Sequence, residues 1–442
     1  MKILSRISIA SGSVFLIIIS WIAALTLKID IEDETEIQKR LITRADEYLA
    51  DEIYILAVPL LEEAIEYQNE YTFKTENKLK ELYLKFINKQ DFRKKYTALL
   101  EKQMTREDPP ADIFIEAADY YIKHSKLIEA CDILEAGIEK TGNINILKLY
   151  ESIRYAYKFE KNNYEDVTDI FGDTIGVKNK GLWGLANSNG NIIVPCQYDK
   201  ISTFNSGRAI VKKDGIIFAV DAQNNRVALL KHEENEEIYD FGNLSEEFSS
   251  VLTKKGWKRV NINLEMGTMA FDEIGLYSNS YAAAKQNGKW GIINPDSNWL
   301  VPAEYDGVIT DESGRAYMQN RFFLKKDGSV YLFDKNGRIG EAYEDARPFC
   351  SGKYAAVKKS GKWGFINTSG ELIIPYQFNN ALSFGQHLAA VKKGELWGYI
   401  NIYGNIVIEP IFLQAKSFAN NSAPVLTENG WDFISLIVKQ NS

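Results

Sequence analysis

The sequence predicts an all-β repeat domain, either a β-propeller of 7–8 units or an open β-solenoid-like stack, preceded by an all-α helical-repeat segment and one transmembrane helix. Three observations support this fold class. A phrase such as "GKWGFINTSGELIIP" (361–375) returns through the C-terminal two-thirds of the 442-residue chain. A long stretch before it has apolar residues at helical spacing and almost no Gly. An uncharged apolar run stands close to the first residue.

The apolar run covers residues 7–27 and follows a short basic segment, residues 1–6. A helix of 21 residues rises about 30 Å, which matches the hydrocarbon core of a bilayer. We therefore expect a transmembrane signal-anchor at 7–27 and a cytoplasmic tail at 1–6. The protein would sit in the cell membrane with a single pass, the lipid bilayer as one partner and the bulk of the chain extracytoplasmic. Secretion after signal cleavage is the alternative, although bulky Leu25 and Leu27 stand where a cleavage site would need small residues.

The helical segment is expected at 33–162. Small and apolar residues recur where one helix of a pair would let the next approach closely: Ala45, Ala57, Leu61, Ala64, Ala118, Tyr121, Ala130, Leu134 and Gly137. These segments resemble tetratricopeptide-type helix pairs. The resemblance implies a concave surface that binds peptide or protein segments. A compact stalk or docking platform for the next domain is the other interpretation.

The β domain is expected at 164–442. Aligning the repeated phrase gives copies at Trp183, Ile217, Trp257, Trp290, Val330, Trp363, Trp397 and Trp431, with successive spacings of 34, 40, 33, 40, 33, 34 and 34 residues. Each unit is too thin to bury a core alone. A period of this length therefore predicts stacked units.

Each copy is expected to contain three strands and a short fourth element. Pairs such as Asp214-Gly215, Asn287-Gly288 and Asp327-Gly328 favour a tight hairpin between the first two strands. Asn187, Asn294, Asn367 and Asn401 are expected to open the next turn by accepting backbone N–H bonds. Pro195, Pro302, Pro375 and Pro410 are expected to stop the third strand. An aromatic segment then leads into the next copy.

The tryptophans and the glycines that follow them are interpreted as structural. A buried indole gives each unit a large surface to pack on its neighbour, and Gly allows another backbone to approach closely. These structural positions are Trp183, Gly184, Trp257, Trp290, Gly291, Trp363, Gly364, Trp397, Gly398 and Trp431. A ring of exposed tryptophans that binds sugars is the alternative.

The pattern W-G-[FYIL]-[IA]-N, followed by a turn, an aliphatic strand, Pro and an aromatic residue, resembles the bacterial WG-repeat family, also written KWG. The resemblance covers roughly 280 residues, with strong copies at 183, 290, 363 and 397. It implies an architecture and no particular activity.

Composition excludes several classes of function. A formal net charge of -8 argues against a nucleic-acid partner, because affinity for phosphates comes chiefly from Lys and Arg. The sequence shows no catalytic constellation, and with 3 His and 3 Cys it predicts no metal or cofactor site. We therefore expect a protein that is not an enzyme.

Two departures from a plain scaffold indicate binding. Lysine pairs end the same strand in several copies: Lys212, Lys213, Lys254, Lys255, Lys325, Lys326, Lys358, Lys359, Lys392 and Lys393. Two longer spacings contain inserted loops at 230–248 and 305–323, where loops on a rigid scaffold commonly carry specificity. The alternatives are that the lysines are solvated hairpin shoulders that guard strand edges, and that the longer spacings reflect sequence drift in copies that are not needed. The leading prediction is a protein-interaction module or scaffold with protein partners. The alternative is a binder of cell-envelope glycan or anionic polymer through the lysine rim.

Overall fold

The computed structural model describes residues 33–229 and 237–438. They form two compact units that divide between Leu147 and Lys148. The predicted anchor at 7–27 and tail at 1–6 lie outside the described residues. Among the residues that are described, no helix is both long enough and apolar enough to cross a membrane.

Helices make up the N-terminal part of the described chain. They are α2 (Glu34–Ala50), α3 (Tyr54–Ala64), α4 (Thr72–Lys85), α5 (Gln90–Met104), α6 (Ala111–Lys123), α7 (Leu127–Thr141) and α8 (Ile144–Ile153). The first begins where the Asp33 side chain accepts a hydrogen bond from Thr35 N at 3.1 Å, which is the usual way to satisfy a free N–H at a helix start.

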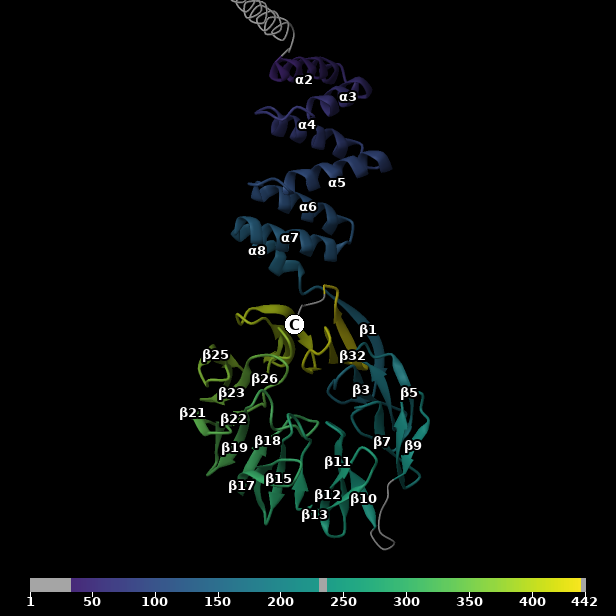
Figure 1. The fold of residues 1–442 in the computed structure, drawn as a ribbon, viewed down its shortest axis with the longest axis vertical. Coiled ribbons are helices and arrows are strands. Elements are labelled where there is room, and N and C mark those ends of the chain that lie inside the picture. Colours follow the sequence, from purple (N-terminus) through teal and green to yellow (C-terminus); the bar gives the residue numbers. More distant parts are fainter. Residues whose placement is uncertain (1–32, 230–236, 439–442) are drawn as a thin grey trace, which may run out of the picture. The chain divides into compact units, whose positions relative to one another are not determined.

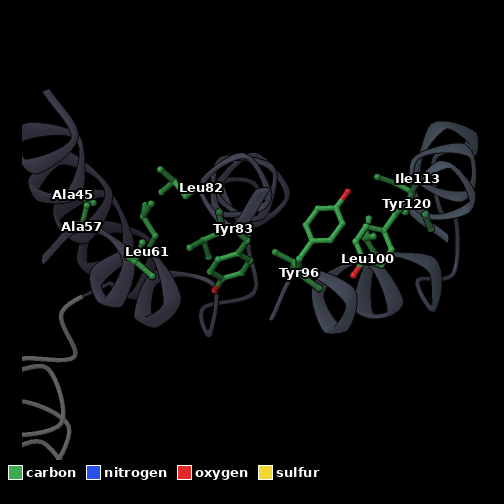
Figure 2. Packing of buried hydrophobic residues seen from close by; sticks show 13 residues of the cluster. Ala45, Ala57, Leu61, Leu82, Tyr83, Tyr96, Leu100, Ile113 and Tyr120 are labelled. Carbon is green, nitrogen blue, oxygen red and sulfur yellow. The ribbon is translucent and has the colours of Figure 1, made fainter. Parts of the chain in front are cut away.

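The small residues predicted to sit between paired helices do so. Ala45, Ala57 and Leu61 are fully buried, and a Cβ on Gly137 would stand 2.7 Å from the Phe114 ring. Figure 2 shows the larger side chains of this core directed between successive helices. The tetratricopeptide resemblance itself stays a prediction.

The expected helical boundary at 162 is wrong by several residues. Helix α8 ends at Ile153, and β1 (Tyr157–Tyr164) already belongs to the β unit. Its sequence, YKFEKNNY, is largely polar and lacks the repeated motif, because this strand is exposed along most of its length. The local sequence pattern of β1 therefore does not indicate that this strand joins a sheet whose other strands lie near the C-terminus.

Within 33–229 and 237–438 the strands form eight four-stranded antiparallel sheets. They are called blades 1 to 8 in chain order, beginning with the sheet that contains β2 and ending with the sheet that contains β30. Blade 1 contains β2 (Asp166–Val167), β3 (Thr174–Asn179), β4 (Leu182–Asn187) and β5 (Ile192–Tyr198), and blade 2 contains β6 (Lys200–Ile201), β7 (Arg208–Lys213), β8 (Ile216–Asp221) and β9 (Arg226–Leu229). Blade 3 contains β10 (Ile238–Phe241), β11 (Phe248–Thr253), β12 (Gly256–Asn261) and β13 (Met266–Phe271), and blade 4 contains β14 (Glu273–Ile274), β15 (Ala282–Gln286), β16 (Lys289–Ile293) and β17 (Trp299–Tyr305).

Blade 5 contains β18 (Gly307–Ile309), β19 (Phe322–Lys326), β20 (Ser329–Asp334) and β21 (Gly337–Tyr343), and blade 6 contains β22 (Asp345–Ala346), β23 (Ala355–Lys359), β24 (Lys362–Ile366) and β25 (Leu372–Phe378). Blade 7 contains β26 (Asn380–Ala381), β27 (Ala389–Lys393), β28 (Leu396–Ile400) and β29 (Ile406–Phe412). Blade 8 contains β30 (Gln414–Ala415), β31 (Ser422–Thr427) and β32 (Gly430–Leu436), with β1 as its fourth strand. Figure 1 shows these blades arranged around a common centre.

The ring is closed, which excludes the open stack. Strand β1 pairs antiparallel with β32, from Tyr157 opposite Leu436 to Tyr164 opposite Trp431. A hydrophobic cluster also joins blade 8 to blade 1 by placing Trp431 and Phe433 against Val167. The last copy lacks its own fourth strand because the start of the β unit supplies it.

The repeated tryptophans pack one blade on the next, as predicted. Trp363 is 3% exposed and shares a cluster with Val391 and Ile400 of blade 7. Trp397 likewise packs with blade 8, and Trp431 with blade 1. Trp183, Trp257 and Trp290 are only partly buried. The indoles are therefore internal packing groups in the later copies and half-covered ones in the earlier copies.

The prediction that proline stops the third strand of a copy is wrong. Pro195, Pro302, Pro375 and Pro410 all lie inside the outermost strands β5, β17, β25 and β29. Each lies at a shift in strand register, such as the one between Trp397 and Tyr399 on β28. An edge strand tolerates proline at a bulge because no ladder donor is needed there.

The turns follow their predicted chemistry. Asp214 and Gly215, like Asn287 and Gly288, have positive φ angles in the tight hairpin between second and third strands. Asn401 Oδ1 accepts from the backbone N–H groups of Tyr403 and Asn405, both at 3.1 Å. Local sequence therefore specifies the blade, whereas ring closure depends on distant residues.

Candidate functional site

The lysine pairs lie at one end of the propeller, near the turns between second and third strands. In blades 2, 5, 6 and 7 they end β7, β19, β23 and β27. In blade 3 the prediction fails: β11 ends at Thr253, and Lys254 and Lys255 form the turn instead. Thr253 Oγ1 stabilises that turn by accepting from Lys255 N at 3.2 Å.

Acidic residues alternate with these lysines. Lys359 pairs with Glu341, and Lys392 pairs with Glu395 at 2.9 Å. Asp345 lies directly opposite Lys358 across the strand pair. At the same end, Asp306 accepts a hydrogen bond from Asp327 N at 2.8 Å. The rim is therefore a mixed-charge surface, with Lys254, Lys255, Lys325, Lys326 and Lys393 exposed.

The opposite end of the propeller holds a charged centre that the insertion in blade 5 creates. After β18 the chain turns inward instead of returning directly to β19. Ser313 O accepts from Asn243 Nδ2 of blade 3 at 3.0 Å, and Gly314 O accepts from Leu276 N of blade 4 at 2.9 Å. The Arg315 guanidinium lies 5.0 Å from the centre of the Phe171 ring of blade 1, across the ring of blades.

Two adjoining cavities of about 250 and 360 Å³ flank this insertion. Both are lined by Asp169, Asp311, Cys350 and Ser417, which come from the inner loops of blades 1, 5, 6 and 8. The insertion predicted at 305–323 therefore lies over the middle of the propeller, where it meets loops from most of the ring.

A buried ammonium joins the insertion to the surrounding loops. The side chain of Lys416 is 7% exposed and pairs with Glu312 of the insertion, while its Nζ lies 3.7 Å from Asp169 Oδ1. Within the insertion, Arg315 Nε donates to Asp311 Oδ2 at 2.6 Å. Buried charges persist only where opposite charges and hydrogen bonds compensate their lost hydration, and here both are present.

This environment shifts two titratable groups. Burial raises the pKa of Asp169 to about 6; Lys416 opposes the rise, whereas Glu312 and Asp311 add to it. Burial, followed by the charge of Asp311, raises the pKa of the Cys350 thiol to about 12. Cys350 is therefore an uncharged thiol at neutral pH. Across 33–229 and 237–438, no group of three or more His, Cys, Asp or Glu is placed to hold a metal ion.

The helical unit contains a separate groove of about 370 Å³ between α4 and α6. Phe73, Leu84 and Ile113 supply its apolar surface. Lys80 Nζ donates to Glu116 Oε2 at 2.5 Å, so the ammonium in the groove is already neutralised. Exposed Glu81 and Asp112 line the same groove, which gives it an acidic edge.

Six stretches of the chain match the family model described as WG containing repeat, at residues 183–215, 268–290, 290–321, 342–363, 363–397 and 397–431. These stretches of the propeller are similar to the WG containing repeat. The unmatched parts of the propeller include the copies at Ile217, Trp257 and Val330, in which the repeated phrase is weakest. No curated protein matches the chain.

Solved structures resemble the chain only in fold. Hsv2 of Kluyvelomyces marxianus is 10% identical with a TM-score of 0.36, covering 63% of this chain and 99% of that one. A eukaryotic initiation factor is 12% identical with a TM-score of 0.40, covering 58% and 78%. The Pan2 WD40 domain of Neurospora crassa is 12% identical with a TM-score of 0.31, covering 66% and 91%. At these levels the matches carry no argument about function.

The sequence indicates the insertion but gives no sign of the charged centre of the propeller. Asp169, Cys350 and Lys416 follow the short first strands of three different blades, and no repeat position marks them. The 40-residue spacing between Trp290 and Val330 is the one sequence feature that indicates the insertion, and it does not indicate the charged residues around it.

Proposed function

We propose that the protein is a membrane-anchored, extracytoplasmic interaction scaffold without catalytic activity, in which the groove between α4 and α6 receives a partner protein. The groove is the observation that carries this proposal. It combines exposed Leu84 and partly buried Phe73 with the exposed carboxylate of Glu81, next to a cation that Glu116 already neutralises. Apolar surface with a polar edge is typical of recognition sites for protein segments.

Charge defines the partner's chemistry. Residues 33–147 contain 24 Asp or Glu against 16 Lys or Arg, so this unit carries an acidic field. An apolar segment flanked by Lys or Arg complements both the groove and the field, and the attraction would speed association at low salt.

The test uses a photo-crosslinking residue at Leu84 of the full-length chain, with Lys94 on the exposed surface of α5 as the matched control position. We expect one partner protein to crosslink from position 84 and not from 94. With that partner purified, Leu84→Glu should weaken binding at least tenfold. The double variant Glu81→Lys/Asp112→Lys should reduce its salt dependence. Equal crosslinking from both positions, or unchanged binding by Leu84→Glu, would overturn the proposal.

Anchoring is tested by fractionating cells that express the full chain or a chain lacking residues 1–27. We expect the first in membranes and the second in the soluble fraction. Protease added from the extracytoplasmic side of sealed vesicles should digest the β unit. A full-length chain in the soluble fraction, or protection from that protease, contradicts this part of the proposal.

Binding of an anionic envelope polymer is the second candidate, favoured by the exposed Lys325-Lys326 and Lys254-Lys255 pairs at one end of the propeller. Heparin is a suitable polyanion probe. We expect Lys325→Glu/Lys326→Glu to weaken heparin binding, and wild-type affinity to fall as salt rises. Binding that ignores salt, or survives the double substitution, rejects this candidate.

A further inference from the structure

The inserted segment 310–316 of blade 5 fills the position where the inner loops of the propeller converge. Its backbone is tied to blades 3 and 4 through Ser313 O and Gly314 O, and its charged side chains reach blades 1 and 8. Ala316, at the end of the segment, is fully buried. No covalent bond secures the segment, since the cysteine beside it, Cys350, is a free thiol.

The segment is held on its outer side mainly by charge. Glu312 is 64% exposed, yet its carboxylate pairs with the buried ammonium of Lys416. Asp311 and Arg315 neutralise each other within the segment, which leaves it a net charge of one carboxylate. That charge faces Lys416, which attracts it, and Asp169, which repels it.

We propose that residues 310–316 are a pH-dependent plug that closes the centre of the propeller in acid and is released as the pH rises above neutrality. Release would join the two adjoining cavities into one polar chamber lined by Asp169, Cys350 and Ser417, open at this end of the ring.

Proton linkage at Asp169 sets the direction. Lys416 from blade 8, Asp311, Glu312 and Arg315 from the plug, and the Cys350 thiol from blade 6 all face this carboxyl. Its pKa of about 6 in the closed state exceeds the ordinary value of 3.8, because the surrounding loops and the plug leave its side chain only 24% exposed and the plug adds acidic neighbours. Release exposes the carboxyl further and removes Asp311 and Glu312 from it, so the closed state binds the proton more tightly. Closure is then fully favoured below about pH 4, and that advantage is lost as the pH rises through 6. Two pKa units limit the change to about 100-fold.

The experiment is hydrogen exchange on the full-length chain at pH 5.0 and 7.5, expressed as protection factors so that intrinsic exchange rates cancel. The reporter is the Leu276 amide, which donates to Gly314 of the plug at 2.9 Å. The Asp272 amide, which donates to Lys285 at 2.9 Å at the other end of blade 4, is the internal reference. We expect Leu276 to be about tenfold more protected at pH 5.0 while Asp272 is unchanged.

Asp169→Asn should keep Leu276 highly protected at both pH values, because the repulsion that releases the plug is absent. Asp173→Asn, a change to an exposed carboxylate in the same loop, should behave like the wild type. Equal pH dependence at Leu276 and Asp272, or persistence of the Leu276 effect in Asp169→Asn, would overturn the proposal. The wild-type comparison alone remains decisive if the Asp169 variant does not fold.

Discussion

At the scale of single residues, the two members of each Trp-Gly pair have different packing roles. The indole fills the space between blades, whereas the glycine admits the backbone of the outermost strand at its proline bulge. A Cβ on Gly398 would stand 2.4 Å from Ile408 O and 2.7 Å from Pro410 N. Those neighbours are backbone atoms held in a sheet and have no rotamer to change.

Gly398→Ala should therefore lower the free energy of unfolding by about 3 kcal/mol, the upper part of the usual range for overpacking. Gly394→Ala is the matched control, because its φ of +63° brings strain but no heavy atom lies within 4 Å of the added carbon. The control should cost about 1 kcal/mol. Urea unfolding measures both, and equal losses would contradict the packing role of Gly398.

The role of a residue was predictable from the sequence where the same residue type recurs at the same position in several copies. The indoles, the asparagine turns and the Asp-Gly or Asn-Gly hairpins each recur, so one physical explanation covers several copies. Pro410 was wrongly predicted to end its strand, because proline lacks the backbone N–H that a strand donates to its neighbour but can still lie within an edge strand. Lys416 and Asp169 carried no signal, since their proximity arises from closure of the ring.

At the scale of the element, each blade depends on its neighbour. Phe365 and Ile366 are adjacent in β24, yet they belong to clusters on opposite faces, one shared with blade 7 and the other with blade 5. Strand alternation therefore contributes to two interfaces at once. The sequence predicted these thin sheets well, because hydrophobic alternation and turn chemistry are local properties.

Trp363→Ala should destabilise the β unit more than Trp183→Ala. Trp363 is 3% exposed and lies between two blades, so its removal leaves a cavity that costs about 4 kcal/mol. Trp183 is only partly buried, and about 2 kcal/mol is expected. Thermal unfolding of the two variants compares them directly. A larger loss for Trp183 would contradict the assignment of Trp363 as the more important packing group.

At the scale of the whole β unit, closure depends on contacts between its first and last strands. The carboxylate of Asp432 is buried and accepts from Asn162 N at 2.7 Å and Asn163 N at 2.9 Å. It also accepts from Thr427 Oγ1 at 2.9 Å. One side chain thus fixes β1 to the final hairpin, which neither repeat spacing nor composition revealed.

Asp432→Ala should lower the free energy of unfolding by about 2 kcal/mol, because three donors lose the buried carboxylate that accepts from them. Asp432→Asn keeps one acceptor oxygen and should cost less. Hydrogen exchange should locate the effect, with the amides of Tyr157–Tyr164 exchanging faster than those of blade 4. Uniform exchange across the propeller would show that Asp432 does not secure the closing strand.

The pairing of β1 with β32 also determines when blade 8 can form during synthesis. The strand that completes blade 8 leaves the ribosome before any blade, and its partner leaves after all of them. Until then β1 presents an unpaired edge, and the first and last blades each lack a neighbour. Joining such distant segments is slow because a long loop must close first. Shielding of that edge by a chaperone during translation would therefore have its largest effect on this one strand.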